Sequence, residues 1–154
     1  TANLAATIAN RGHYYVPHIA RRIQGEQLDT LYTRRRHTKV DPKWYDYAVE
    51  GMRRAVLGGT CRGAAIPGYE VCGKTGTAQN RGHDHSAFMG FAPMHQPRIA
   101  VSVYIENGGF GATYAVPIGQ LIMEQFLNGR LSAASQAKAN VFQARRINYG
   151  TEAR

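Results

Sequence analysis

The chain has 154 residues, of which 44% are hydrophobic and 19% are charged. This balance is that of an ordinary globular protein, and it excludes a disordered polyelectrolyte, a collagen-like or coiled-coil repeat, and any run near the roughly 18 apolar residues of a membrane-spanning helix. The 19 Lys and Arg against 10 Asp and Glu give a net charge of +9, which favours polyanionic partners without choosing among nucleic acid, anionic lipid and acidic polymers.

The first forty residues predict one helix followed by irregular structure. Residues 2–10 place apolar side chains at helical spacing, and a glycine follows as a stop. Because Thr1 already lies at the beginning of this helix, we interpret the chain as cut from a longer protein. Residues 14–23 alternate loosely around a proline and predict an edge strand or extended connector, and the polar residues 24–40 predict a surface loop or hairpin.

The clearest predicted helix begins at Asp41-Pro42, since Asp caps a helix and Pro is tolerated at its first position. Gly58-Gly59 ends it. An apolar stripe at helical spacing runs between these limits, comprising Trp44, Tyr47, Ala48, Met52, Ala55 and Val56. We expect this stripe to lie in the core or at an interface.

Strand patterns follow at residues 70–79, 86–92 and 98–106, joined by short turn-rich connections. The last of them alternates large and small side chains, as a half-buried strand does. A final amphipathic helix is predicted from Val116 to Asn128. These elements indicate an α+β fold, with an antiparallel sheet of at least three strands flanked by helices.

The last residues differ from the rest of the chain in composition. Residues 130–154 are rich in Ala, Gln and Arg and poor in large apolar side chains, which predicts a disordered or marginally helical tail. We therefore divide the chain into a folded portion, residues 1–129, and this tail.

One short motif carries the chemistry: Lys74-Thr75-Gly76-Thr77, on the first strand of the predicted sheet. A lone Lys-Thr-Gly is a weak signal, but a strand edge presents N–H groups that can stabilise the oxyanion of an acyl-transfer intermediate. The Lys74 cation can bind a carboxylate and support proton transfer. The two threonine hydroxyls can bind the same carboxylate, and Gly76 leaves room for a substrate backbone.

The flanking sequence strengthens this interpretation. The stretches 73–79, 85–93 and 106–109 occur in an order that resembles the C-terminal part of the transpeptidase domain of class B penicillin-binding proteins, in the serine β-lactamase-like superfamily. The ending Glu-Asn-Gly-Gly resembles the cell-elongation branch of that family, the penicillin-binding protein 2 type. The resemblance covers about residues 1–129.

The resemblance implies a serine-type D,D-transpeptidase that cross-links peptidoglycan stem peptides ending in D-Ala-D-Ala, takes β-lactams covalently and needs no cofactor. Lys74 and Thr77 would be catalytic, the Thr77 N–H being one of two oxyanion donors, and Lys74, Thr75, Gly76 and Thr77 would bind substrate. The parent would work at the extracytoplasmic (periplasmic) face of the bacterial inner membrane, with its anchor outside this chain, beside a polytopic glycan polymerase and the elongation machinery.

The chain also departs from the family pattern, in which Ser-x-x-Lys and Ser-x-Asn both precede the Lys-Thr-Gly. No Ser-x-Asn occurs, and the one Ser-x-x-Lys, from Ser135 to Lys138, follows the motif in the tail. We interpret it as a chance match and expect the chain alone to be inactive. Without an upstream helix over the sheet, we also expect the isolated chain to self-associate or to be marginally stable.

Two other functions compete with this interpretation. A D,D-carboxypeptidase or β-lactamase would share the Lys-Thr-Gly, although residues 87–93 and 106–109 favour the transpeptidase. A basic nucleic-acid-binding domain would use the net charge, but the sequence has no helix-turn-helix, RRM or zinc-finger signature, so we expect no nucleic acid. Arg34–Arg36 is either a solvated loop or a contact with phosphate, from nucleic acid or from lipid headgroups.

The remaining candidates are a metal cluster and a disulfide. His83, Asp84 and His85 offer too few well-spaced ligands for zinc, and we expect no metal. Cys61 and Cys72 are eleven residues apart. A disulfide between them is chemically allowed outside the cytoplasm, but two free, partly buried thiols are the favoured interpretation.

Overall fold

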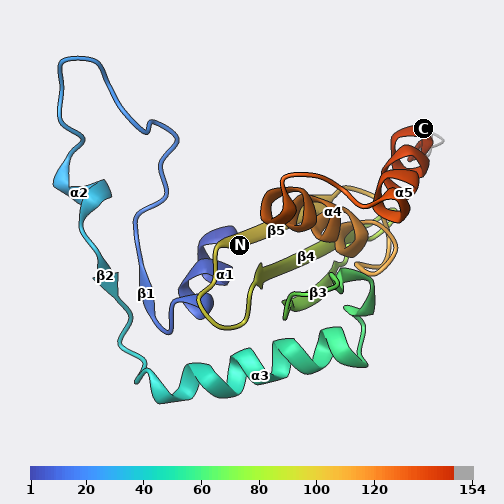
Figure 1. Ribbon diagram of the computed structural model, residues 1–154, viewed down its shortest axis with the longest axis horizontal. Coiled ribbons are helices and arrows are strands. Elements are labelled where there is room, and N and C mark those ends of the chain that lie inside the picture. The colour runs from blue at the N-terminus through green and yellow to red at the C-terminus, as the bar shows by residue number, and fades with distance from the viewer. Residues whose placement is uncertain (148–154) are drawn as a thin grey trace.

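The computed structural model describes residues 1–147. A three-stranded antiparallel sheet lies at the centre, with α1 and α3 packed against one side and α4 against the other (Figure 1). The helices are α1 (Ala2–Ala9), α2 (Thr30–Thr33), α3 (Lys43–Leu57), α4 (Ala115–Asn128) and α5 (Ala133–Ala144), with a 3₁₀ turn η1 at Arg62–Ala64. The strands are β1 (His13–Tyr14), β2 (Arg36–His37), β3 (Cys72–Ala78), β4 (His85–Ala92) and β5 (Ile99–Ile105).

The sheet has the order β3-β4-β5, and both neighbouring pairs are antiparallel. In its register Lys74 lies opposite Met89, and Ser86 lies opposite both Thr77 and Ile105. The α+β class and the antiparallel sheet flanked by helices, predicted from the sequence, are confirmed. None of the helices within residues 1–147 combines the length and hydropathy that crossing a bilayer requires.

The two sides of the sheet belong to two hydrophobic clusters. On the α4 side, Val101 and Val103 of β5 pack with Phe88 of β4. On the side of α1 and α3, Cys72 and Phe91 pack with residues of both helices. The division follows from the alternation of side chains along a strand, and it is why β3 is covered from both faces at its beginning.

The ring of Phe88 occupies a slot made by three glycines. A Cβ at Gly73 or Gly90 would lie 2.6 Å from a ring atom of Phe88, and a Cβ at Gly119 on α4 would lie 2.5 Å away. No real side chain tolerates such a distance, so only glycine lets β3, β4 and α4 close around the ring. Phe88 pairs with Thr75 in the register, and the slot therefore lies directly behind the Lys-Thr-Gly motif.

Helix α3 begins as predicted but buries a different face. The Lys43 N–H donates to the Asp41 carboxylate at 3.1 Å, as in the predicted cap, although the helix itself begins at Lys43 with Pro42 in the N-cap position. Trp44 and Tyr47, however, are 56% and 73% exposed, so a place in the core is wrong for them, while the alternative of an interface stays a prediction. The buried side chains of the helix are Tyr45, Val49, Met52 and Val56.

The cause of this rotation lies outside the helix. The Tyr45 hydroxyl is 2.6 Å from the Thr38 hydroxyl, and its ring lies where a side chain at Gly12 would be. Tyr45 is thus held by two residues that lie outside α3. Helical periodicity alone does not separate Trp44 and Tyr47 from the buried residues of α3, because both are apolar and suitably spaced.

Residues 13–40 form an arm that extends away from the sheet (Figure 1). At its base β1 and β2 pair antiparallel, with His13 opposite His37 and Tyr14 opposite Arg36. The rest is irregular except for α2, whose first turn is capped by the Asp29 carboxylate. The predicted alternative of an extended connector fits better than an edge strand, since only one residue of 14–23 is in β1.

The tail contains a helix, α5, which lies against α4 (Figure 1). The Ser132 hydroxyl caps it by accepting the Ser135 N–H at 3.3 Å. Of the two states predicted for residues 130–154, helix is the one found at Ala133–Ala144. Residues 148–154 lie outside the described residues, and the division of the chain at residue 129 stays a prediction.

A buried polar network joins α5 to α4. Glu124 accepts hydrogen bonds from the Ser132 N–H at 2.9 Å and from the Ser135 hydroxyl, and Lys138 donates to Gln120 at 2.6 Å. Burial acts to raise the pKa of Glu124, but these hydrogen bonds together outweigh it and lower the pKa. Because polar groups make this contact, hydrophobic periodicity does not reveal it.

Candidate active site

The motif Lys74–Thr77 lies on β3, which is an edge strand of the sheet. Lys74 and Thr77 are exposed, whereas Thr75 and Gly76 are partly buried. Along an edge strand the N–H and C=O groups that do not face the neighbouring strand remain available to another chain. The structure therefore presents the motif as an accessible strand edge, with all four predicted residues brought together.

The beginning of β3 is anchored from α3. Arg53 donates to the Val71 carbonyl at 3.2 Å, and Cys72 is fully buried in the cluster between α3 and the sheet. From Cys72 to Ala78 every residue of β3 has a partner on β4. This support fixes the position of the strand, and a preorganised site requires such a fixed position.

Thr60 is a site residue that the sequence did not reveal. Its hydroxyl lies 2.8 Å from the Thr75 hydroxyl, and it comes from the turn after α3, fifteen residues earlier in the chain. Lys74 donates to the Thr75 carbonyl at 2.7 Å. The side chain and the main chain of Thr75 therefore each have a hydrogen-bond partner. A threonine before a cysteine carries no signal by itself, because only the packing of α3 on β3 brings it to the motif.

The loop after β5 closes one face of the motif. A Cβ at Gly111 would lie 2.5 Å from the Ala87 carbonyl oxygen and 2.8 Å from that of Gly76, so the loop backbone rests directly on β3 and β4. A Cβ at Gly76 would meet only Ala87 within 4 Å among the described residues. Since alternate residues share a face, Lys74 and Gly76 share this less crowded one, and Thr75 and Thr77 face the other way.

The two cysteines are free and buried, as the favoured interpretation predicted. Burial raises the pKa of Cys72 to about 11. Burial also raises the pKa of Cys61, against opposing hydrogen bonds from Thr60 and Thr75. A thiolate is the nucleophilic form of cysteine, so neither thiol is suited to attack a carbonyl at neutral pH.

The Ser-x-x-Lys of the tail has a structural role. Ser135 is buried between α4 and α5, and its hydroxyl donates to Glu124. Lys138 is engaged with Gln120 instead of activating the serine. A nucleophile must be reachable by its substrate, and the buried Ser135 hydroxyl, which is committed to Glu124, is not.

The histidine-rich turn contributes hydrogen bonds. The Asn107 N–H donates to His85 Nδ1 at 3.0 Å, and the Asp84 carboxylate accepts the Asn80 N–H at 3.4 Å. Within residues 1–147, no three His, Cys, Asp or Glu side chains come together in a way that could hold a metal ion.

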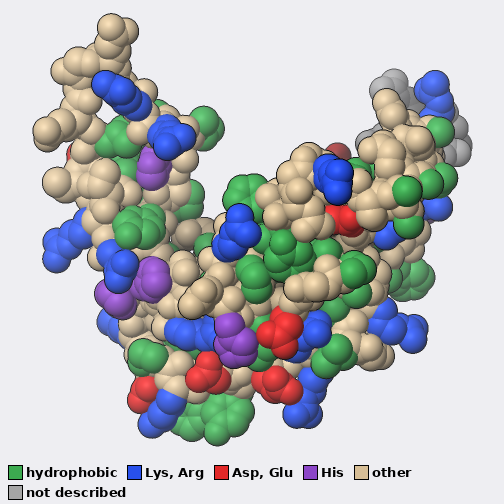
Figure 2. Space-filling view, in the orientation of Figure 1, with side chains coloured by type: hydrophobic (Ala, Val, Ile, Leu, Met, Phe, Trp, Pro, Cys, Tyr) green, Lys and Arg blue, Asp and Glu red, His purple; other side chains and the backbone are tan. Residues whose placement is uncertain are grey.

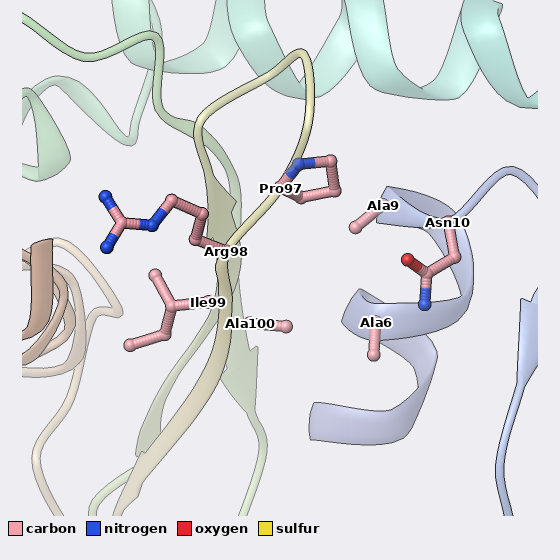
Figure 3. A pocket seen from close by; sticks show the side chains of 7 residues that line it. All are labelled: Ala6, Ala9, Asn10, Pro97, Arg98, Ile99 and Ala100. Atoms are coloured by element: carbon pink, nitrogen blue, oxygen red, sulfur yellow. The ribbon is translucent and has the colours of Figure 1, made fainter.

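A cavity of about 190 Å³ lies between α1 and the beginning of β5, away from the motif. Ala100 points across it toward α1, whereas Arg98 and Ile99 point to the opposite side of the strand (Figure 3). Its lining is mostly apolar, and no residue of Lys74–Thr77 contributes to it. The candidate active site is therefore the open edge of β3.

Comparison with known proteins agrees with this geometry. The family model described as penicillin binding protein transpeptidase domain matches residues 1–124. The peptidoglycan D,D-transpeptidase MrdA of Haemophilus influenzae is 29% identical over 98% of this chain and 27% of that protein. MrdA of Acinetobacter baumannii is 34% identical over 74% of this chain and 20% of that protein.

Solved structures show the same likeness. The crystal structure of Pseudomonas aeruginosa PBP2 superposes with a TM-score of 0.71 and 37% identity, covering 86% of this chain and 30% of that one. Penicillin-binding protein A of Mycobacterium tuberculosis, as a ceftriaxone acyl-enzyme, gives 0.67 and 32%, covering 80% and 30%. The chain thus spans about a quarter of the curated relatives it matches, and it belongs to the penicillin-binding protein transpeptidase domain family.

Proposed function

We propose that the chain is the C-terminal part of a peptidoglycan D,D-transpeptidase of the penicillin-binding protein 2 type. Such an enzyme would cross-link stem peptides during cell-wall elongation through an acyl-enzyme on a serine outside these residues. The observation that carries the proposal is the motif Lys74–Thr77 on an ordered, accessible strand edge. The family match and the relatives named as D,D-transpeptidases support it.

The proposed reaction has two acyl transfers. The serine hydroxyl attacks the carbonyl carbon of the penultimate D-Ala, and the amide bond to the terminal D-Ala breaks, so that D-Ala leaves with the proton and an ester remains. An amine of a neighbouring stem peptide then attacks the ester, forms the cross-linking amide and returns the serine hydroxyl. Each step passes through a tetrahedral oxyanion.

The motif would supply one wall of this site. The Thr77 N–H would donate to the oxyanion, and loss of one such donor costs about 2.7–4 kcal/mol in a well-studied hydrolase. Lys74 would place its cation beside the serine and the substrate carboxylate. The Thr75 and Thr77 hydroxyls would bind that carboxylate, and Gly76 would let the peptide lie along β3. Thr60 would hold the Thr75 hydroxyl in position.

The wider context extends the same proposal. The parent would bind stem peptides ending in D-Ala-D-Ala and would take β-lactams covalently, as the ceftriaxone acyl-enzyme among the structural neighbours does. A further neighbour is a peptidoglycan synthase complex that coordinates polymerization and crosslinking, which supports a glycan polymerase as partner. The site would face the extracytoplasmic (periplasmic) side of the inner membrane, held there by an anchor outside these residues.

Fluorescent penicillin labelling of the full-length protein tests the proposal. We expect the wild type to be labelled, the Lys74→Ala variant to be acylated about a hundredfold more slowly or worse, and the 154-residue chain alone to remain unlabelled. Lys43→Ala is the matched control, because Lys43 is an exposed lysine at the beginning of α3. An unlabelled wild type contradicts the function, and unchanged labelling of Lys74→Ala contradicts the role of Lys74.

A further inference from the structure

The arm formed by residues 13–40 carries a polar cavity, separate from the candidate active site and from the cavity beside α1. It has a volume of about 400 Å³ and is lined by Tyr14, Arg34, Arg35, Arg36 and His37. It lies at the pairing of β1 with β2, where Tyr14 is directly opposite Arg36. We call it the arginine cavity.

The arm has far more positive than negative charge. Its basic side chains are Arg21, Arg22, Arg34, Arg35, Arg36 and Lys39, against the acidic Glu26 and Asp29. The ion pairs formed within residues 1–147 all lie outside the arm, and those nearest to it are Arg11–Asp46 and Lys43–Asp41. Figure 2 shows blue and purple side chains gathered on the lobe that this arm forms. The arm's own carboxylates do not neutralise its arginines.

One guanidinium nitrogen in the arginine cavity is enclosed without a partner. Arg36 Nε is buried and makes no hydrogen bond to any described residue. A buried N–H that has lost its water and gained no acceptor is costly, and native proteins satisfy nearly all such groups. Arg36 therefore lines the cavity with a guanidinium that has an unmet donor among the described residues.

The pairing of β1 with β2 also brings two histidines and Arg35 close together. His13 lies beside His37, with 6.1 Å between ring centroids. Burial lowers the pKa of His13, and the positive charge of Arg35 lowers it further, against a hydrogen bond to the Asn10 backbone. Burial disfavours any charge on His13, and the nearby Arg35 adds a positive potential around β1 and β2.

We propose that the arginine cavity binds a phosphate group of a phosphomonoester or phosphodiester. Three guanidinium groups provide the planar, multiple N–H donors that match phosphate oxygens, and Tyr14 and His37 add donors at the edge. The volume leaves room for part of the molecule that carries the phosphate. The proposal does not depend on the transpeptidase function, because no residue of the cavity belongs to the motif on β3.

Isothermal titration of the full-length protein with inorganic phosphate and with pyrophosphate, at constant ionic strength, tests the site. Two double variants remove the same charge from the same arm: Arg35→Gln/Arg36→Gln in the cavity and Arg21→Gln/Arg22→Gln outside it. We expect saturable binding that weakens by about tenfold or more in the first variant and by no more than about twofold in the second. An equal loss in both variants, or no saturable binding by the wild type, overturns the proposal.

A third variant separates the enclosed nitrogen from charge and from misfolding. Arg36→Lys keeps the positive charge but removes the N–H at Nε and the guanidinium fork. We expect it to unfold at the wild-type temperature and to bind phosphate several-fold more weakly. Unchanged affinity in Arg36→Lys would show that charge alone acts and would overturn the site.

Vesicles distinguish the source of the phosphate. Phosphatidylcholine vesicles with and without phosphatidylglycerol are compared by sedimentation with the same variants. If the cavity holds a lipid headgroup, only the phosphatidylglycerol vesicles sediment the protein, and Arg35→Gln/Arg36→Gln abolishes this while Arg21→Gln/Arg22→Gln does not. If titration detects phosphate but the vesicles bind all variants alike, the ligand is a soluble phosphoester.

Discussion

The glycine slot around Phe88 gives a sharp test of how β3 is positioned. In Gly119→Ala the new Cβ would lie 2.5 Å from Cδ1 and 2.6 Å from Cε1 of the Phe88 ring. The ring cannot swing away freely, because it is 1% exposed and Gly73 and Gly90 already bring their backbones against it. The substitution must therefore move α4 or the ring.

The expected magnitude is a difference between two opposing effects. Overpacking a well-filled core costs about 1–3 kcal/mol, while replacing Gly by Ala inside a helix gains about 1 kcal/mol. We expect Gly119→Ala to lower the free energy of unfolding by about 0–2 kcal/mol after this offset. Gly51→Ala is the matched control, because Gly51 lies inside α3 with nothing within 4 Å of its Cβ position, and it should gain about 0.5–1 kcal/mol.

Thermal unfolding followed by circular dichroism measures both variants, with about 2–4 °C expected per kcal/mol for a chain of this size. A double-mutant cycle combines Gly119→Ala with Phe88→Leu. If the Phe88 ring is the obstacle, Gly119→Ala should lower the free energy of unfolding less in the Phe88→Leu background than in the wild type. Because Phe88 pairs with Thr75, Gly119→Ala should also slow penicillin acylation in the full-length protein. A Gly119→Ala variant as stabilised as Gly51→Ala would refute the reasoning.

Three further predictions concern the groups around the site and the tail. Thr60→Val should slow acylation by up to about tenfold, since a hydrogen bond contributes about 0.5–1.5 kcal/mol, while Thr60→Ser should retain the rate; equal rates for all three would contradict the positioning role. The lowered pKa of Glu124 means that its stabilising contribution is complete above the ordinary value of 4.5 and is lost as the pH falls through the lowered pKa, so acid unfolding of Glu124→Gln should lack this component. Cys61 and Cys72 should resist iodoacetamide at neutral pH until denaturant is added, because burial raises both pKa values; rapid native labelling would disprove this.

Much of the fold and part of the site were predictable because they depend on local patterns. The alternation in β5 and the turn-rich connections determined the antiparallel sheet, and β3, β4 and β5 lie within two residues of the predicted limits. Asp41 determined the beginning of α3 through a cap made within two residues. The motif order likewise predicted the family that the comparisons show.

Other features were decided by contacts between segments far apart in the chain. Tyr45 faces inward because Thr38 and Gly12 lie there, an arrangement that no helical periodicity contains. Thr60 reaches Thr75 only because α3 packs against β3.

The tail shows the same division between local and tertiary causes. Its composition indicates weak intrinsic order, since few large apolar residues can drive packing. Helix α5 forms against α4 because Glu124 accepts hydrogen bonds from Ser132 and Ser135, two residues at the beginning of the helix. By itself the sequence determined where the main helices and the three strands of the sheet lie, and it predicts which four residues carry the chemistry. Only the tertiary structure decided which faces are buried and which polar groups meet, because those depend on partners that sequence spacing does not specify.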